Sequence, residues 1–192
     1  MNLIKFIVTG FGVGLFPYFS GTLGSLIAFP ISYLILIAAS KTGACLHIES
    51  LNESGQELAG IFGIYIIVFI IILISGIYLS DIYAKYTRKQ DPKEVVIDEI
   101  MGQMLTLIIS FPTLIFAHKS YLGQYLRPEQ IDVIFLFCLP FFFFRFFDIL
   151  KPWPIGDIDK NIKGGFGIML DDFVAGIFAG ITCYIVTFIL IA

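Results

Sequence analysis

The sequence predicts an all-α fold, a polytopic membrane helical bundle of about five spans preceded by a short N-terminal re-entrant or interfacial helix. Hydrophobic residues make up 58% of the 192 residues and only 14% are charged, and the mean hydropathy is +0.92. A soluble domain carries about 25% charged residues, so the excess apolar surface needs lipid to cover it. The apolar residues also gather in stretches of about 20, the length that spans a hydrocarbon core.

The first apolar piece, Leu3–Phe16, is short and rich in glycine, so we expect it to be re-entrant or interfacial rather than a full span. Five longer stretches follow. Pro30 and Pro112 each fall inside one of these stretches, and membrane helices tolerate a proline. With no internal repeat and no low-complexity linker, residues 1–192 are expected to form a single domain. The predicted spans are Thr22–Ala39, Ala59–Leu79, Ile100–Ala117, Ile131–Phe147 and Phe173–Ala192.

Five spans place alternate loops on opposite sides of the membrane. One side receives the N-terminal segment and the loops Ser80–Glu99 and Asp148–Asp172, and by the positive-inside rule its excess of Lys and Arg directs it to the cytoplasm. The net charge of −3 and the lack of a basic stripe exclude nucleic acid as a partner. The basic residues are Lys5, Lys85, Arg88, Lys89, Lys93, Arg145, Lys151, Lys160 and Lys163 on this side, and Lys41, Lys119 and Arg127 on the other.

Five carboxylates fall at the same predicted boundary. Asp98 and Glu99 open the third span, Asp148 closes the fourth, and Asp171 and Asp172 open the fifth. One acid at a helix N-terminus is usually a cap, but two adjacent pairs exceed what capping uses. Like charges at this depth repel one another unless a cation neutralises them, and carboxylate oxygens suit Mg²⁺.

We therefore predict that all five acids are catalytic, and that a magnesium ion is held by Glu99, Asp148, Asp171 and Asp172. Their spacing leaves open which one acts as a base, and whether one ion binds or two.

Candidate phosphate ligands lie on the same side. Residues 20–25 lead into the first span, where N–H groups and hydroxyls can face an anion. Residues 163–167 could form an anion-binding loop nest, although a segment of either kind, taken alone, is more often a turn or a close helix crossing. Arg145 shares a helix face with Asp148, which also fits an ordinary ion pair. The predicted phosphate-binding residues are Ser20, Thr22, Arg145, Lys151, Gly164 and Gly165.

Other phosphoryl chemistries fit less well. His47 and His118 fall in loops on the side opposite the acids, so a histidine base or phosphohistidine is not expected. Cys138 and Arg145 miss the spacing of thiol phosphatases by one residue. The pair Asp157 and Asp159 lacks the preceding hydrophobic strand of an aspartyl-phosphate site, which favours a solvated loop. Metal-assisted attack by water is the simplest remaining chemistry.

Five blocks of the sequence resemble the phosphatidylglycerophosphatase A family, in the family's order. The resemblance implies a Mg²⁺-dependent hydrolase of phospholipid biosynthesis in the bacterial inner membrane. Such an enzyme converts phosphatidylglycerol phosphate to phosphatidylglycerol and inorganic phosphate, the last step of phosphatidylglycerol synthesis. The polar stretch Lys41–Gln56 is long for the family. The blocks are residues 10–14, 20–25 and 98–99, R-x-x-D-x-x-K-P-W-P at 145–154, and G-G-x-G-I-M-x-D-D at 164–172.

Three alternatives remain at this point. A divalent-cation transporter could use the acids as an entry ring, but the centres of the predicted spans hold no carboxylate. A membrane phosphotransferase acting on CDP-alcohols would need a D-G-x-x-A-R block, which the sequence does not contain. A structural subunit would leave the paired acids unexplained. The expected partners are the lipid substrate and membrane lipids, and the sequence leaves the oligomeric state open.

Overall fold

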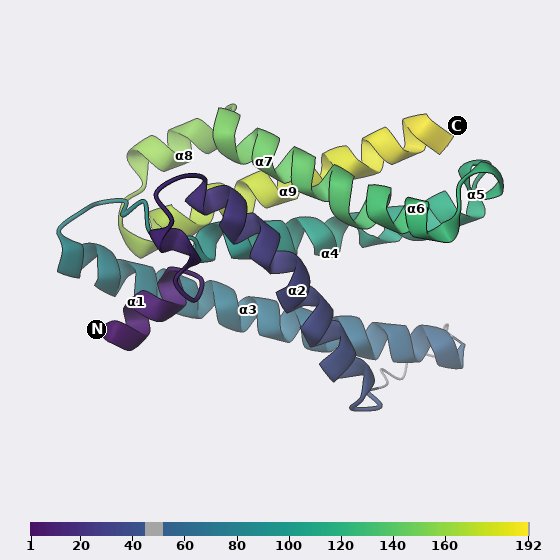
Figure 1. Ribbon diagram of the computed structural model, residues 1–192, viewed down its shortest axis with the longest axis horizontal. Coiled ribbons are helices and arrows are strands. Elements are labelled where there is room, and N and C mark those ends of the chain that lie inside the picture. Colours follow the sequence, from purple (N-terminus) through teal and green to yellow (C-terminus); the bar gives the residue numbers. More distant parts are fainter. Residues whose placement is uncertain (45–51, 192) are drawn as a thin grey trace.

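The computed structural model describes residues 1–44 and 52–191, and this part of the chain is helical, with no strand (Figure 1). Five helices are long and apolar enough to cross a membrane. The predicted fold class is confirmed, and the protein is a membrane protein. The five are α2 (Ser20–Ser40), α3 (Glu53–Thr87), α4 (Ile97–Lys119), the continuous segment of α6 (Pro128–Asp132), η2 (Val133–Cys138) and α7 (Leu139–Leu150), and α9 (Gly164–Ile191).

The N-terminal piece does not span, as expected. Helix α1 (Asn2–Val8) is about 10 Å long, and the chain then turns because Gly10 and Gly12 adopt positive φ values of 55° and 95°. A single 3₁₀ turn, η1 (Val13–Leu15), follows. The Val8 carbonyl accepts a hydrogen bond from the Val96 N–H (2.9 Å), which docks α1 beside the start of α4.

Helix α3 is longer at both ends than its apolar stretch predicted. It begins at Glu53, where the Asn52 side chain caps it by accepting from the Gly55 N–H (2.9 Å). It ends at Thr87, where Arg88 takes a left-handed conformation. Hydropathy identifies the part of a helix that lies in lipid, whereas the polar turns beyond it are fixed by capping and packing. The expected loop Lys41–Gln56 is therefore partly helical, and residues 45–51 lie outside the described residues.

Helix α4 forms the centre of the bundle and packs against α2, α3, α7 and α9. Its closest neighbour is α9, because glycines face each other at the crossing: a Cβ atom at Gly176 would lie 2.6 Å from the Gly102 carbonyl oxygen. The buried Thr106 hydroxyl lies within hydrogen-bonding distance of the carbonyls of both glycines, at 3.0 and 3.3 Å. Small residues and hydroxyl bonds at a crossing are typical of membrane helices.

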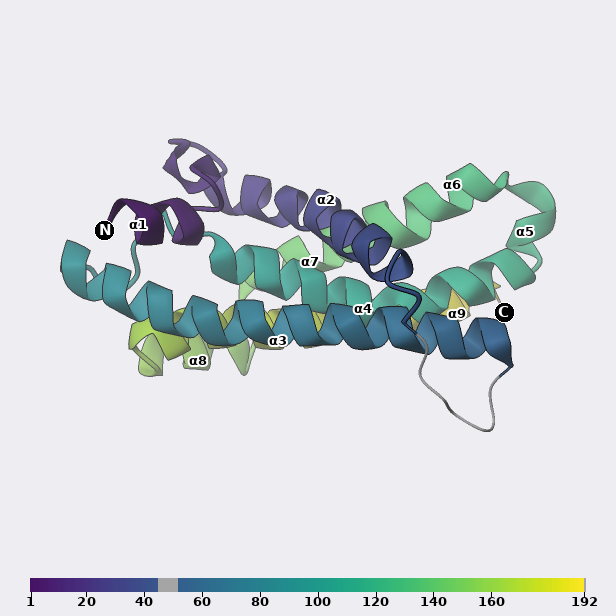
Figure 2. The same ribbon diagram turned by 90° about the horizontal axis from the view of Figure 1, so that it is seen from below.

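The fourth span changes its winding at a proline. Pro140 follows the first residue of α7, and the π-helical η2 comes directly before that helix. Proline has no N–H group and its ring crowds the carbonyl four residues earlier, and the wider π turns give that carbonyl more room. The two short helices α5 (Leu122–Tyr125) and α8 (Ile155–Asn161) lie at opposite ends of the bundle (Figures 1 and 2).

One end of the bundle, here called the carboxylate end, is where α2, α4 and α9 begin and where α3 and α7 end. Helices α1 and α8 cover it, on the left in Figures 1 and 2. This arrangement follows from the alternating directions of successive spans. It brings the beginnings of α4 and α9 and the end of α7 to the same end of the bundle. The five acids that the sequence predicts to be catalytic come with them.

We predict that Gly176→Val lowers stability. The added methyl groups would meet the Gly102 carbonyl, and overpacking of this kind costs about 1–3 kcal/mol. The thermal unfolding midpoint of the purified protein in detergent should fall. Ile181→Val, on the exposed side of the same helix, should leave the midpoint nearly unchanged. Equal midpoints for the two variants would contradict the close α4–α9 contact.

Candidate active site

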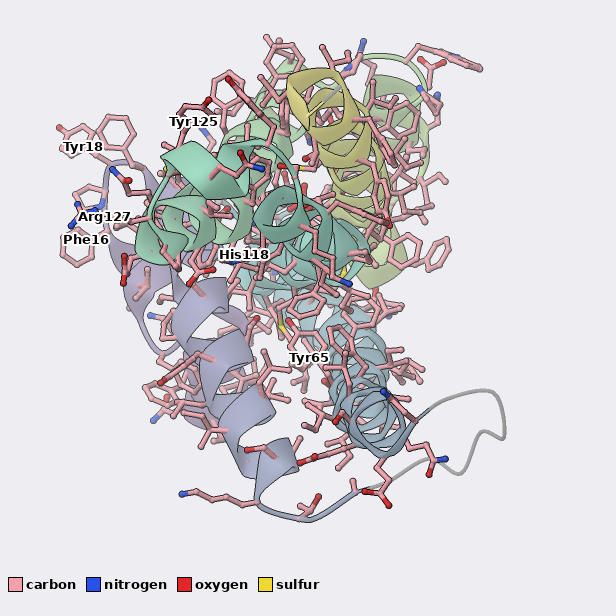
Figure 3. All side chains as sticks on the ribbon, turned by 90° about the vertical axis from the view of Figure 1, so that its right-hand side faces the viewer. Phe16, Tyr18, Tyr65, His118, Tyr125 and Arg127 are labelled. Atoms are coloured by element: carbon pink, nitrogen blue, oxygen red, sulfur yellow. The ribbon has the colours of Figure 1, made fainter. Side chains whose placement is uncertain are left out.

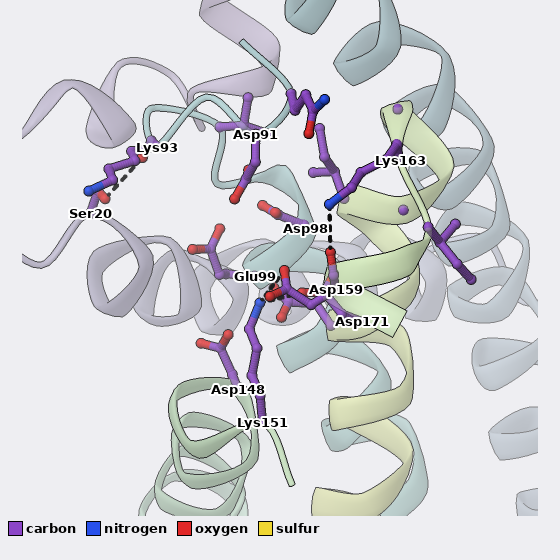
Figure 4. Close-up of a pocket in the computed structure, with 17 residues that line it drawn as sticks. Ser20, Asp91, Lys93, Asp98, Glu99, Asp148, Lys151, Asp159, Lys163 and Asp171 are labelled. Carbon is purple, nitrogen blue, oxygen red and sulfur yellow. Dashed lines mark hydrogen bonds and ion pairs between the residues drawn. The ribbon is translucent and has the colours of Figure 1, made fainter. Parts of the chain in front are cut away.

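A cavity of about 280 Å³ lies at the carboxylate end (Figure 4). Its walls come from the start of α2, the segment before α4, the start of α4, the end of α7, helix α8 and the first turns of α9. Acidic side chains outnumber basic ones in this lining, so the cavity attracts cations. The charged lining residues are Asp91, Asp98, Glu99, Asp148, Asp159, Asp171 and Asp172, with Lys93, Lys151 and Lys163.

Three of the acids form a compact group. One carboxylate oxygen from each of Asp98, Glu99 and Asp172 lies within 4.8 Å of the others. The carboxyl groups of Asp98 and Glu99 are in hydrogen-bonding contact, and so are those of Asp148 and Asp172. Two ionised carboxylates repel each other at such distances, so these contacts require a shared proton or a cation.

The group fits a hard divalent cation. The Asp98 Oδ1 and Glu99 Oε2 atoms are buried and have no hydrogen-bond partner among the described residues. A buried, unpaired carboxylate oxygen is costly, and a metal ion with several oxygen ligands would satisfy both atoms. Of the four expected metal ligands, Glu99 and Asp172 belong to this group. Asp98, expected only in a catalytic role, is its third member.

Asp171 is held by a lysine. The Lys151 Nζ atom lies 2.6 Å from Asp171 Oδ2 and 2.9 Å from Asp159 Oδ1. Burial alone would lower the pKa of the Lys151 ammonium, but the hydrogen bonds and charges of Asp171 and Asp159 outweigh it and raise that pKa. Lys151 is therefore a permanent positive charge at the cavity wall.

Asp148 is held by an arginine. Arg145, one helical turn earlier on α7, forms an ion pair with Asp148, and its Nη1 donates to the Ser25 hydroxyl on α2 (3.3 Å). The start of α2 reaches this close because Gly21 has no side chain: a Cβ atom there would meet Glu99 Oε1 and lie 3.2 Å from Arg145 Nη1. The glycine thus brings the guanidinium group beside the acidic cluster.

The helix positions of the acids differ in part from the expectation. Asp98 and Glu99 lie in the first turn of α4 and Asp148 lies in the last turn of α7, as predicted. Helix α9, however, begins at Gly164, so the expectation that Asp171 and Asp172 open a helix is wrong. They lie about two turns inside it, beyond the range of the favourable helix dipole.

The glycine segment before these acids is helical, so the expected loop nest at residues 163–167 is also wrong. The Gly165 N–H donates to Asp81 on α3 (3.3 Å), and a Cβ atom at Gly165 would meet the Ile77 carbonyl. This glycine makes a close helix crossing, the alternative explanation. Gly164 does line the cavity.

Ser20 also lines the cavity, and its hydroxyl donates to the Lys93 carbonyl (3.3 Å). Thr22 is partly buried in the first turn of α2 and is not among the described residues that line the cavity. His118 lies at the opposite end, beside Asp132 (Figure 3). His47 is outside the described residues.

Sequence reasoning missed several residues. Asp159 was assigned to a solvated loop, yet it belongs to helix α8 and pairs with Lys151 across the cavity. Its spacing of four from the buried Ile155 was a usable signal, since residues at i and i+4 share a helix face. The sequence also gives no sign that Ser25 contacts Arg145 or that Asp91 lines the cavity. Nothing in their local sequence marks them, because their contacts come from distant elements.

Acidic oxygens suited to a hard cation, next to fixed positive charges at the boundary of a membrane bundle, define a membrane-embedded enzyme of phosphate chemistry. The comparison with protein families makes this specific. The family model described as phosphatidylglycerophosphatase A matches residues 6–187, and the chain belongs to this family. The protein is accordingly a phosphatase.

Individual relatives agree. The chain is 32% identical to a phosphatidylglycerophosphatase A of Escherichia coli, over 93% of this chain and 81% of the relative. It is 29% identical to a protein of the same description from Haemophilus influenzae, over 98% and 91%. A putative phosphatidylinositol-3-phosphatase of Bacteroides thetaiotaomicron is 25% identical, over 89% and 85%. No solved structure matches.

We predict that Lys151→Met lowers the free energy of unfolding by about 2 kcal/mol, because it leaves two carboxylates without their shared cation. The raised pKa of Lys151 means that its stabilising contribution is complete below the unfolded lysine pKa of about 10.4, and is lost only as pH rises through the folded value. The difference from wild type, measured by thermal unfolding, should therefore be constant between about pH 7 and pH 9.

The matched control is Lys160→Met, an exposed lysine on α8, which should cost little at any of these pH values. A difference between wild type and Lys151→Met that shrinks steadily toward the alkaline end would show that Lys151 loses its proton in this range and that the ion pairs do not hold it.

Proposed function

We propose that the protein hydrolyses phosphatidylglycerol phosphate to phosphatidylglycerol and inorganic phosphate, in a Mg²⁺-dependent reaction at the cytoplasmic face of the bacterial inner membrane. The substrate is suggested by the descriptions of two relatives. The observation that carries the proposal is the group Asp98, Glu99 and Asp172, whose carboxylate oxygens gather within 4.8 Å at the membrane boundary.

Asp98, Glu99 and Asp172 are the residues that would hold the metal. A bound Mg²⁺ supplies charge neutralisation and polarises the phosphoryl oxygens. Asp148 and Asp171 lie next to this group, and each is oriented by its own basic partner. Asp171 Oδ1 has no hydrogen-bond partner among the described residues, and we assign this oxygen to orienting the attacking water and accepting its proton.

Arg145 and Lys151 stabilise the transferred phosphoryl group. Arg145 pairs with Asp148 and Lys151 pairs with Asp171, so each places a positive charge beside the acids. The Arg145 Nε atom is buried and has no partner in the described part of the chain, so it can donate to a phosphoryl oxygen without giving up the bond to Ser25. Donors that are already oriented when charge develops on the phosphoryl oxygens lower the barrier most effectively.

The surroundings of the cavity favour a lipid substrate. Several large apolar side chains that are within two residues of the cavity lining along the chain are exposed, and Trp is enriched at membrane–water interfaces. They are Phe19, Ile149, Leu150 and Trp153. A phosphate monoester on a lipid head group would reach the acids while its chains remain in the bilayer. The excess of Lys and Arg at the carboxylate end supports a cytoplasmic orientation.

Cation transport is supported less well. Directly beyond Asp98 and Glu99 along α4, the side chains of Met101 and Met104 are fully buried, and Met169 of α9 packs with them in the same core cluster. A conduction path for a divalent cation needs charged or strongly polar groups near the middle of the membrane. The buried polar side chains farther along α4 are all uncharged, and the helix carries no carboxylate beyond its first turn. They are Gln103, Thr106, Ser110 and Thr113.

We predict that a chelator abolishes phosphate release from phosphatidylglycerol phosphate and that added Mg²⁺ restores it. Asp172→Asn should lower kcat roughly 10²- to 10³-fold, because it removes one ligand charge from the group of three. Release of inorganic phosphate by the purified protein in detergent micelles measures both effects.

The matched control is Asp157→Asn, an exposed aspartate on α8 at the same end of the molecule, which should retain wild-type activity. Full activity of Asp172→Asn would contradict the assignment of the site. Wild-type protein that is active in the presence of chelator would rule out the metal.

The proposed orientation has its own test. In a variant without the native cysteines, a single cysteine at Lys41, beyond the end of α2, should react in intact cells with a thiol reagent that cannot cross the inner membrane. A single cysteine at Lys160 on α8 should react only after the cells are permeabilised. The reverse labelling pattern would place the carboxylate end outside the cytoplasm.

A further inference from the structure

A second cavity, of about 260 Å³, lies within the spanning part of the bundle, away from the acids. We call it the apolar groove. Helices α2, α3 and α4 and the segment η2 line it, and nearly all of the lining is apolar. The rings of Phe62 and Phe111, 4.6 Å apart, lie on one side and Leu36 of α2 on another. Tyr33 lines it and is 65% exposed, so the groove opens toward lipid there.

The two buried hydroxyl groups in the groove satisfy each other. The Ser32 hydroxyl and the Tyr65 hydroxyl are 2.6 Å apart, and both residues are buried. Tyr65 lies between α2 and α3 (Figure 3). A hydroxyl pair that is already hydrogen-bonded offers little to a polar ligand, so the chemistry of the groove suits a hydrocarbon chain.

The groove lies at the depth of lipid chain ends. Ser20 lines the active-site cavity and Ser32 lines the groove, and the helical rise places them about 18 Å apart along α2. Helix α2 runs obliquely across the bundle (Figure 1), so the difference in depth is smaller than this distance. The chains of one leaflet fill about 15 Å, half of the hydrocarbon core. A lipid with its head group among the acids therefore has its chain ends at the level of the groove.

We propose that the apolar groove binds one acyl chain of the lipid substrate, so that recognition extends from the phosphate into the membrane. This inference rests on the proposed function. An acyl chain that enters the groove moves there from the hydrocarbon of the membrane, not from water. It therefore gains packing contacts with the protein and no hydrophobic transfer energy. The groove therefore strengthens substrate binding modestly and affects KM rather than kcat. It also makes KM depend on chain length.

The test compares phosphatidylglycerol phosphate with two palmitoyl chains and with two hexanoyl chains, in detergent micelles. Leu36→Trp fills the groove and should raise KM for the palmitoyl substrate roughly three- to tenfold, with kcat unchanged. KM for the hexanoyl substrate should not change, because its chains are too short to reach the groove. Leu34→Trp, the same substitution at an exposed position of α2, is the control and should leave both KM values unchanged.

The outcomes separate the two proposals. If Leu36→Trp changes KM for both substrates alike, or for neither, the groove does not hold the chain, while hydrolysis by the wild type still supports the proposed function. If the wild type releases phosphate from neither substrate, both proposals fail. Leu107→Phe, in the α4 lining of the groove, gives the same test with a smaller added volume if Leu36→Trp unfolds.

Discussion

Mutual repulsion among acids at a membrane boundary is the constraint on which the rest of this structure depends. Five carboxylates that the sequence places on three helices meet in one partly dry cavity. Two of them, Asp148 and Asp171, are paired with Arg145 and Lys151. The other three form no ion pair with a described basic residue and lie within 4.8 Å of one another. Such a cluster is stable only when protons or cations reduce its charge.

The packing of the bundle creates this situation. A Cβ atom at Gly102 would lie 2.7 Å from the Asp172 carbonyl oxygen, so the close approach of α4 and α9 fixes Asp172 next to the first turn of α4. Gly21 does the same for α2, bringing it against Glu99 and Arg145. Because these glycines have no side chains, the helices approach each other closely at both crossings. This close approach also determines which charged groups meet.

Much of this could be predicted from the sequence, because the signals are local. Apolar length identifies the spans, and the acids at their ends follow from counting along the chain. The ends of the helices were harder to predict, because hydropathy does not indicate how far a helix continues into polar residues. Helix α9 begins at Gly164 because Gly165 donates to Asp81 and packs against α3. The pairing of Lys151 with Asp159 likewise depends on how α8 folds back over the cavity.

The charges of the cavity also constrain the order of events in the proposed reaction. Seven carboxylates line it against three lysines, with Arg145 beside them. A phosphate monoester is a dianion near neutral pH, and this surplus of negative charge would repel it. A divalent cation held by Asp98, Glu99 and Asp172 would remove two charges from the surplus. In the proposed reaction such a cation would have to bind before the lipid phosphate or together with it, and acids that repel the substrate on their own would then help to bind it through the cation.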